Sequence, residues 1–243
     1  MTTIIKIIVG FLIGLTIMSC QFNSDFGFGG VRGNGNVDTV ERNIDDNFTA
    51  IKVSRGLDVY ITQSKTVGLK VQADENLHDI IMTKVEEGVL RIYAEENISY
   101  AASKKIMVSI RNIKKITATS GSDVYSTNTI TSKNLELNTT SGSDMELDVD
   151  AEVIECRATS GSDLRLSGKT NKLFAEATSG SDIKARSLKA SISEVRATSG
   201  ADITVNTSDE LYAKATSGGD IKYYGDPEKV TKKDGVSGSV RKQ

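Results

Sequence analysis

A six-residue polar segment that recurs along the second half of the chain constrains the fold most. Ala-Thr-Ser-Gly-Ser-Asp stands at 118–123 and returns five more times with few changes. The copies end at Asp123, Asp144, Asp163, Asp182, Asp202 and Asp220, so successive aspartates are 21, 19, 19, 20 and 18 residues apart. A period near 20 residues is typical of a solenoid, in which each repeat stacks on the repeat before it.

Alternating apolar and polar residues flank every copy. In the unit at 172–185, one parity comprises Leu173, Ala175, Ala177, Ser179, Ser181, Ile183 and Ala185. In the preceding unit, the same parity comprises Ile154, Cys156, Ala158, Ser160, Ser162, Leu164 and Leu166. A period of two is that of a strand with one buried face, so we expect these residues inside. Cys156 is then a small core residue, and no disulfide is expected.

This pattern predicts an all-β fold with a parallel β-helix-like solenoid of about 20-residue coils at 116–225. Equivalent residues of successive coils should lie about 4.8 Å apart, which stacks Ala158, Ala177 and Ala197. Residues 37–115 predict an irregular β region with a hairpin turning at Glu86-Glu87-Gly88 and one helical turn within 74–79. Residues 226–243 are expected to form a C-terminal cap or tail.

The N-terminus has the features of a lipoprotein signal. An apolar run from Ile7 to Met18 follows one lysine. It is shorter than the roughly 20 helical residues that cross a bilayer, and it is typical of a signal-peptide core. Because Ile17-Met18-Ser19-Cys20 resembles a bacterial lipobox, we expect a signal peptide at 1–19 and lipidation of Cys20. The alternative is an uncleaved anchor with an incidental cysteine.

The residues that follow Cys20 predict how the domain is attached and where. Glycines and asparagines are frequent in 20–36, which is typical of a flexible tether between lipid and domain. Gln21 after the cysteine favours the outer membrane of a Gram-negative cell envelope. The membrane is therefore one expected partner, reached through the N-terminal lipid.

Three interpretations of the hexapeptide compete. As a corner between strands, it uses glycine for an unusual backbone angle, with Ser and Asp bonding nearby backbone groups. As a cation site, it stacks Asp123, Asp144, Asp163, Asp182, Asp202 and Asp220 as candidate calcium ligands. As a catalytic site, it would resemble β-helix enzymes that cleave acidic polysaccharides. Catalysis needs residues that the other coils lack, whereas these copies are nearly identical, so we expect the corner.

Composition narrows the classes of function. The net charge is -2 and basic residues are interspersed with acids, which predicts no nucleic-acid partner. His78 is the only histidine, which disfavours a Ser-His-Asp hydrolase, and we expect it on a surface turn. No cofactor is expected. The aromatic candidates for contact with a sugar or protein ligand are Phe174, Tyr212, Tyr125, Tyr223 and Tyr224.

Several segments together resemble the head GIN domain family of auto-transporter-adhesin-like lipoproteins, common in Bacteroidota. They are F-x-x-I-x-V-S-x-G-L-D-V-x-I-T-Q at 48–63, A-D-E-N-L at 73–77, G-V-L-R-I at 88–92, the hexapeptide series and YYGDPEKVTKKDGVSGSV at 223–240. The resemblance covers 37–240 and implies a right-handed β-helical part and a secreted or surface-anchored protein. Within the matching region, 54–58 and 235–239 look like altered corners.

The expected function is that of a lipid-anchored cell-envelope protein, an adhesin or binding scaffold without enzymatic activity. The expected ligand is a surface glycan or protein. Two alternatives stay open: a β-helix protein that binds or cleaves polysaccharide, and a structural surface module stabilised by calcium.

Overall fold

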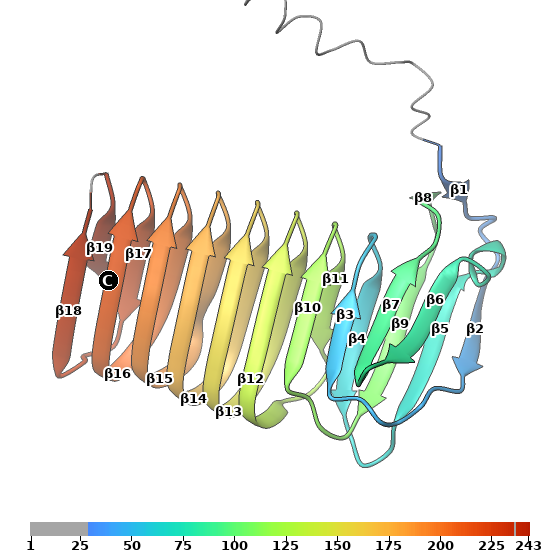
Figure 1. Cartoon of the computed structure of the whole chain (residues 1–243), viewed down its shortest axis with the longest axis horizontal. Coiled ribbons are helices and arrows are strands. Elements are labelled where there is room, and N and C mark those ends of the chain that lie inside the picture. The colour runs from blue at the N-terminus through green and yellow to red at the C-terminus, as the bar shows by residue number, and fades with distance from the viewer. Residues whose placement is uncertain (1–28, 236) are drawn as a thin grey trace, which may run out of the picture.

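The fold is described from a computed structural model, in which residues 29–235 and 237–243 are described (Figure 1). The expected signal peptide at 1–19 and the lipidation site Cys20 lie outside the described residues. The strands of the first part are β1 (Val31–Arg32), β2 (Val37–Arg42), β3 (Ala50–Val53), β4 (Asp58–Gln63), β5 (Gly68–Asp74), β6 (Ile81–Glu86), β7 (Val89–Ala94), β8 (Ile98–Tyr100) and β9 (Lys104–Ile110).

The strands of the second part are β10 (Lys115–Thr119), β11 (Asp123–Ser126), β12 (Ile130–Thr140), β13 (Asp144–Thr159), β14 (Asp163–Thr178), β15 (Asp182–Thr198), β16 (Asp202–Thr216), β17 (Asp220–Tyr224), β18 (Lys229–Asp234) and β19 (Ser239–Lys242). The described part holds no α-helix and one 3-10 helix, η1 (Glu75–Leu77), inside the segment predicted to make one helical turn. No helix there has the length and apolar content needed to span a bilayer.

The second part is the predicted solenoid, a row of coils with two parallel walls (Figure 1). The long strands contribute to both walls: the first residues of β16 pair with β17, whereas its last residues pair with β18. We call the wall that contains β3, β10 and β18 the pre-corner wall, because its strands lead into the Ser-Gly-Ser corner. The wall that contains β4, β11, β17 and β19 is the post-corner wall.

The predicted register is confirmed. Ala158 pairs with Ala177, and Ala177 pairs with Ala197. Each of these alanines is at most 1% exposed. Cys156, aligned with Ala175, is 2% exposed and has no disulfide partner within the described chain. A single coil has too few apolar side chains to be stable alone, so the continuous column of small residues forms the core only when coils stack.

The placement of the first corner serine is the one error in the predicted faces. Ser181 and Ser162 are buried as expected, but Ser179 and Ser160 are exposed. Ser179 and Gly180 both have positive φ, 57° and 67°, and each hexapeptide repeats this pair of angles. Two consecutive left-handed residues form the tight turn seen in two-residue hairpins. The turn carries the first serine outward, and the alternation resumes at the second.

The solenoid extends beyond the six hexapeptides at both ends. Asp58 pairs with Asp123, and Arg55-Gly56 shows the same positive φ angles, so 54–58 is a corner. Ser239 pairs with Asp220, and Ser237 again has positive φ. Both altered corners are therefore confirmed as parts of coils.

The first part of the chain is a curled mixed sheet that closes the N-terminal end of the solenoid (Figure 1). The antiparallel pair β6 and β7 is the predicted hairpin, with positive φ at Glu87 and Gly88. Strand β5 pairs antiparallel with β2 and with β9. Strands β7 and β9 then pair in parallel with β3 and β4, so one apolar core runs through both parts.

Residues 29–36, which we expected to belong to a flexible tether, are bound to the curled sheet instead. Strand β1 pairs with β8, and the backbone N–H of Gly35 donates to a carboxylate oxygen of Asp74, 2.8 Å away. A Cβ at Gly33 would overlap that carboxylate. The glycines therefore allow the backbone to approach closely, where composition alone had indicated flexibility.

Candidate functional site

The predicted aspartates form one straight row on the outside of the post-corner wall. Strand register places Asp144, Asp163, Asp182, Asp202 and Asp220 in direct succession. The row continues through Asp123 to Asp58, a seventh member that the sequence analysis placed at a corner but not among the candidate ligands. Side chains at equivalent positions of parallel strands extend side by side, about 4.8 Å apart.

Basic side chains neutralise only part of this row. Lys184 Nζ lies 3.0 Å from carboxylate oxygens of both Asp163 and Asp182, and Arg165 lies 2.9 Å from Asp163. Where such pairs are missing, burial raises the pKa of Asp123, and the charges of Asp58 and Asp144 raise it further. Burial and the charges of Asp182 and Asp220 likewise raise the pKa of Asp202. The row is therefore neutralised at Asp163 and Asp182 and less compensated at Asp123 and Asp202, on either side.

The geometry of the row bears on the cation interpretation. Within 29–235 and 237–243, no group of three or more His, Cys, Asp or Glu side chains is placed to hold a metal ion. Each aspartate belongs to its own coil, and the ladder spacing keeps the carboxylates parallel instead of convergent. The row is therefore a consequence of the repeat.

The buried serine explains the hexapeptide as a corner. Ser162 Oγ accepts the backbone N–H of Thr159 at 3.1 Å, and Ser143 Oγ donates to the carbonyl oxygen of Ala118 at 2.9 Å. The first contact closes the turn within one coil, and the second binds the corner to the preceding coil. These backbone groups lie where the strand ladder is interrupted, so the serine satisfies them.

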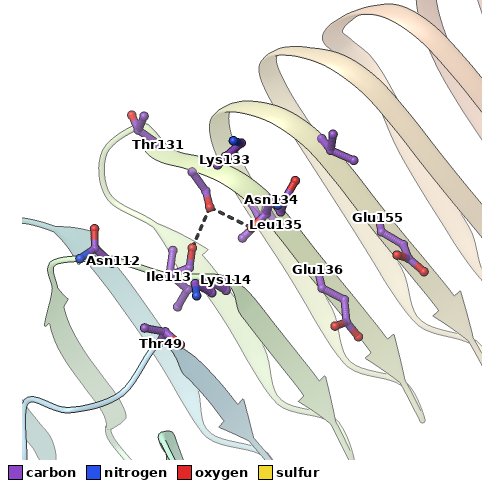
Figure 2. A pocket seen from close by; sticks show the side chains of 12 residues that line it. Thr49, Asn112, Ile113, Lys114, Thr131, Lys133, Asn134, Leu135, Glu136 and Glu155 are labelled. Atoms are coloured by element: carbon purple, nitrogen blue, oxygen red, sulfur yellow. Dashed lines mark hydrogen bonds between the residues drawn. The ribbon is translucent and has the colours of Figure 1, made fainter.

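A hollow in the surface lies where the curled sheet meets the solenoid (Figure 2). It encloses about 920 Å³ and is lined by residues that include Asn112, Lys133, Glu136 and Glu155. Ser132 Oγ donates to the carbonyl oxygens of Ile113 and Asn134, both 2.9 Å away, which holds the bend of β12 open beside the curled sheet.

Two further hollows continue this one along the pre-corner wall. A hollow of about 600 Å³ shares Glu136 and Glu155 with the first, and one of about 420 Å³ shares Glu194 and Arg196 with the second. Neighbouring hollows share lining residues, so they follow one another along the pre-corner wall from the curled sheet to the last coil. We call these hollows together the wall groove.

Two rows of outward side chains form the surface of the wall groove. The first row, in register, is Glu136, Glu155, Phe174, Glu194 and Tyr212. The second row is Asn138, Arg157, Glu176, Arg196 and Lys214. Phe174 is 40% exposed, an unusual state for a large apolar side chain in the middle of a sheet face.

Ion pairs fix the charged residues along the wall groove. Arg157 lies 2.6 Å from Glu176, and Arg196 lies 2.5 Å from Glu194. Hydrogen bonds from Lys115 and Asn138 hold the pKa of Glu136 below its ordinary value. The groove thus presents carboxylates, guanidinium groups and an aromatic ring in a fixed array, which suits hydrogen bonding and stacking with an extended ligand.

The aromatic candidates fall into different places. Phe174 and Tyr212 line the wall groove, whereas Tyr125 stacks on Tyr60 on the post-corner wall with ring centroids 5.2 Å apart. Tyr224 lies beneath the guanidinium of Arg186. Tyr223 was wrongly grouped with them, because it is 5% exposed and fills the core of the last coil.

Sequence reasoning located the turn at His78 but not the wall groove. His78 lies in the turn that follows η1, as expected, but its side chain is 13% exposed, so it is not the surface residue that we expected. Its Nε2 lies 2.5 Å from Asp38. Aligning the repeats by parity would have placed Glu155, Phe174 and Glu194 in one outward row. It could not have shown the hollows, which depend on how the chain bends beside the curled sheet.

A family model described as "Putative auto-transporter adhesin, head GIN domain" matches residues 47–227. The chain belongs to this family. The match spans the curled sheet from β3 onward and the solenoid through β17, so the wall groove lies largely within the head GIN domain. The expected resemblance is thereby confirmed. Among curated proteins, none matches this chain.

Solved structures share the head GIN fold. A "putative adhesin" from Bacteroides fragilis is 20% identical, with a TM-score of 0.80, covering 88% of this chain and 100% of that one. A "putative lipid binding protein" from Parabacteroides distasonis is 24% identical, with a TM-score of 0.72 and coverages of 88% and 99%. A "putative adhesin" from Parabacteroides merdae is 20% identical, with a TM-score of 0.71 and coverages of 88% and 98%. At these identities the similarity establishes the fold.

Proposed function

We propose that this head GIN domain protein is a lipid-anchored adhesin of the cell envelope that binds an extended surface glycan along the wall groove, without catalysis. The observation that carries the proposal is the exposed ring of Phe174 within a groove that crosses several coils. Sugars stack on aromatic faces and form hydrogen bonds with carboxylate, guanidinium and amide groups, and the two groove rows supply all of these.

The spacing of the aromatic residues supports an extended ligand. Phe174 and Tyr212 belong to the same outward row and are separated by Glu194, so their backbones are two strand spacings, about 9.6 Å, apart. This separation is close to the length of a disaccharide unit in an extended glycan. A polymer laid across the coils would therefore meet equivalent contacts at regular intervals.

Anchoring at Cys20 would place the groove at a membrane surface, which suits adhesion. A diacylglycerol on the cysteine holds a protein to one face of a bilayer without crossing it. The outer membrane of a Gram-negative cell is the compartment that Gln21 after the cysteine favours. Mass spectrometry of the membrane-bound protein should show a mature chain that begins at a diacylglyceryl-modified Cys20; an unmodified Cys20, or a chain that still begins at Met1, would contradict lipid anchoring.

The repeated ion pairs support a binding role over cleavage. Lys115–Glu136, Arg157–Glu176 and Glu194–Arg196 place three groove carboxylates beside a cation. A glycosidase needs two carboxyl groups in unlike environments, one protonated and one ionised, whereas these pairs repeat a similar environment. A polysaccharide incubated with the protein should therefore keep its chain length.

A glycan array probed with the full chain in detergent tests the proposal. We expect binding to at least one polymeric glycan, with affinity reduced about tenfold or more by Phe174→Ala, because an exposed aromatic anchor would be removed. Tyr125→Ala, on the opposite wall, is the matched control and should bind as the wild type does. Absence of glycan binding, or an equal loss of glycan affinity in both variants, would contradict a glycan site in the groove. Capture of a protein ligand instead would make a protein, and not a glycan, the ligand of the groove.

A further inference from the structure

The C-terminal end of the solenoid has two free strand edges. Strand β18 pairs on one side with β16, and β19 pairs on one side with β17. Within the described residues, no other strand pairs with their outer edges, and Figure 1 shows β18 and β19 at the end of the row of coils. Unpaired backbone groups at such an edge are a template for another strand, including that of a second copy.

The inner positions of β18 depart from those of every earlier coil. One inner column runs through Ile116, Leu137, Cys156, Ala175, Val195 and Ala213, and its next member is Lys232. The neighbouring column runs through Ala118, Thr139, Ala158, Ala177, Ala197 and Ala215, and its next member is Asp234. The twelve earlier members are all buried, and none is charged.

Lys232 lies across the open end of the core. Its Nζ is 4.9 Å from the centre of the Tyr223 ring and donates to the carbonyl oxygen of Val240, 3.4 Å away. Tyr223 and Val240 are 5% and 7% exposed, so they are the last core residues and Lys232 covers them. The apolar stem can lie on the core while the ammonium reaches water.

A further strand docked on β18 would enclose the charges of Lys232 and Asp234. Both groups would lose water at positions that are buried and uncharged in the six earlier coils, which is unfavourable unless they gain new partners. The outward side chains Lys229, Lys233 and Arg241 add like charges on the same end, which would face each other in a symmetric pair of ends.

We propose that Lys232 and Asp234 keep the C-terminal end of the solenoid from pairing with the same end of a second copy. The contact that these two charges prevent is therefore one between two copies of this chain. A symmetric contact would set β18 of one copy antiparallel to β18 of the other. This inference is independent of the ligand proposed for the wall groove.

Alanine at both positions restores the residues found one coil earlier, Ala213 and Ala215, and leaves the net charge unchanged. We expect the full-length Lys232→Ala/Asp234→Ala variant to form a dimer by light scattering corrected for detergent, more strongly at high salt, where the remaining basic side chains are screened. The wild type and Lys233→Ala should stay monomeric. Lys233 neighbours Lys232 but faces outward, so it is the matched control.

Three results would overturn the proposal: a double variant that stays monomeric at all concentrations and salts, a Lys233→Ala variant that dimerises equally, or a wild type that is already dimeric through this end. Circular dichroism establishes that each variant is folded. If the double alanine variant does not fold, Lys232→Gln/Asp234→Asn removes the charges at nearly constant size. The same three results, measured with this variant, would then overturn the proposal.

Discussion

The side-chain hydroxyl of Ser181 donates a hydrogen bond to the carbonyl oxygen of Ala158, 2.8 Å away and 23 residues earlier. The hydroxyl oxygen of Ser181 in turn accepts the backbone N–H of Thr178 at 3.1 Å. One serine therefore closes the turn of its own coil and attaches that turn to the coil before it. The side chain of Ser179, two residues earlier, is exposed and takes no part in this attachment, to which Ser179 contributes only its backbone carbonyl oxygen, the acceptor of the Gly161 N–H.

The two corner serines should differ in their contribution to stability. Ser181→Ala leaves a buried backbone N–H and a carbonyl oxygen without their partner, which should lower the free energy of unfolding by roughly 1–2 kcal/mol. The variant should still fold, because Ala201 holds the equivalent place one coil later. Ser179→Ala should change stability by less than about 0.5 kcal/mol. Urea unfolding measures both, and equal effects would refute the assignment of faces.

Neutralising one aspartate of the row should have opposite effects at different positions. The pKa of Asp123 is raised by burial and by Asp58 and Asp144, so its ionised form opposes folding above that pKa, and stability is regained as the pH falls through it. Asp123→Asn should therefore stabilise at pH 7, by a few tenths to about 1 kcal/mol after solvent screening. Asp163→Asn, which loses Arg165 and Lys184 as partners, should not. A change in stability of the same sign in Asp123→Asn and Asp163→Asn would be inconsistent with this account.

Calcium should leave the melting temperature unchanged. The carboxylates of the row lie parallel on separate coils, whereas calcium needs six to eight oxygen ligands that converge. Thermal unfolding with calcium and with a chelator tests this. A rise in melting temperature that disappears in Asp123→Asn would instead support the calcium-stabilised alternative.

Acid should release the N-terminal segment through Asp74. Burial raises the pKa of Asp74, but hydrogen bonds from the backbone N–H groups of Ser103, Gly35 and Ala102 outweigh it, and the net pKa is lowered. Its contribution to stability is therefore complete above the unfolded value of 3.8 and lost as the pH falls through the lower folded pKa. Asp74→Asn should flatten this acid dependence and destabilise at pH 7 by roughly 1–3 kcal/mol.

Urea midpoints measured over a range of acid pH values check the Asp74 prediction. Asp209→Asn, at an exposed position of β16, is the control and should keep the wild-type profile. Hydrogen exchange should locate the acid-induced opening at residues 30–36. An unchanged profile in Asp74→Asn would show that other groups govern acid unfolding.

Cys156 should be unreactive in the folded protein. Burial, with a smaller effect of Glu155, raises the pKa of its thiol to about 12, so almost no thiolate forms at neutral pH. Alkylation followed by mass spectrometry of the peptide that carries Cys156 should show slow labelling in buffer and fast labelling in urea. Labelling at equal rates would mean that the inner column opens readily.

The repeat spacing and the two-residue alternation by themselves determined the solenoid, its register and its buried faces. Ala158, Ala177 and Ala197 could be stacked in advance because a coil of nearly constant length brings equivalent residues together wherever it lies. Cys156 followed from the same alignment, and the hairpin at Glu87 followed from local turn chemistry. These features depend on residues that are close in sequence or equivalent in a repeat.

The tertiary structure alone decided features that depend on contacts between unlike, distant segments. Ser179 turns outward because two residues in succession adopt left-handed angles, which alternation does not encode. Gly35 is bound rather than flexible because Asp74, 39 residues later, offers a buried carboxylate. The wall groove arises where the curled sheet meets the first coils, and Lys232 acquires its role because no later coil of the described chain covers it. Each of these features depends on contacts or backbone angles that the 20-residue repeat and the two-residue alternation do not encode.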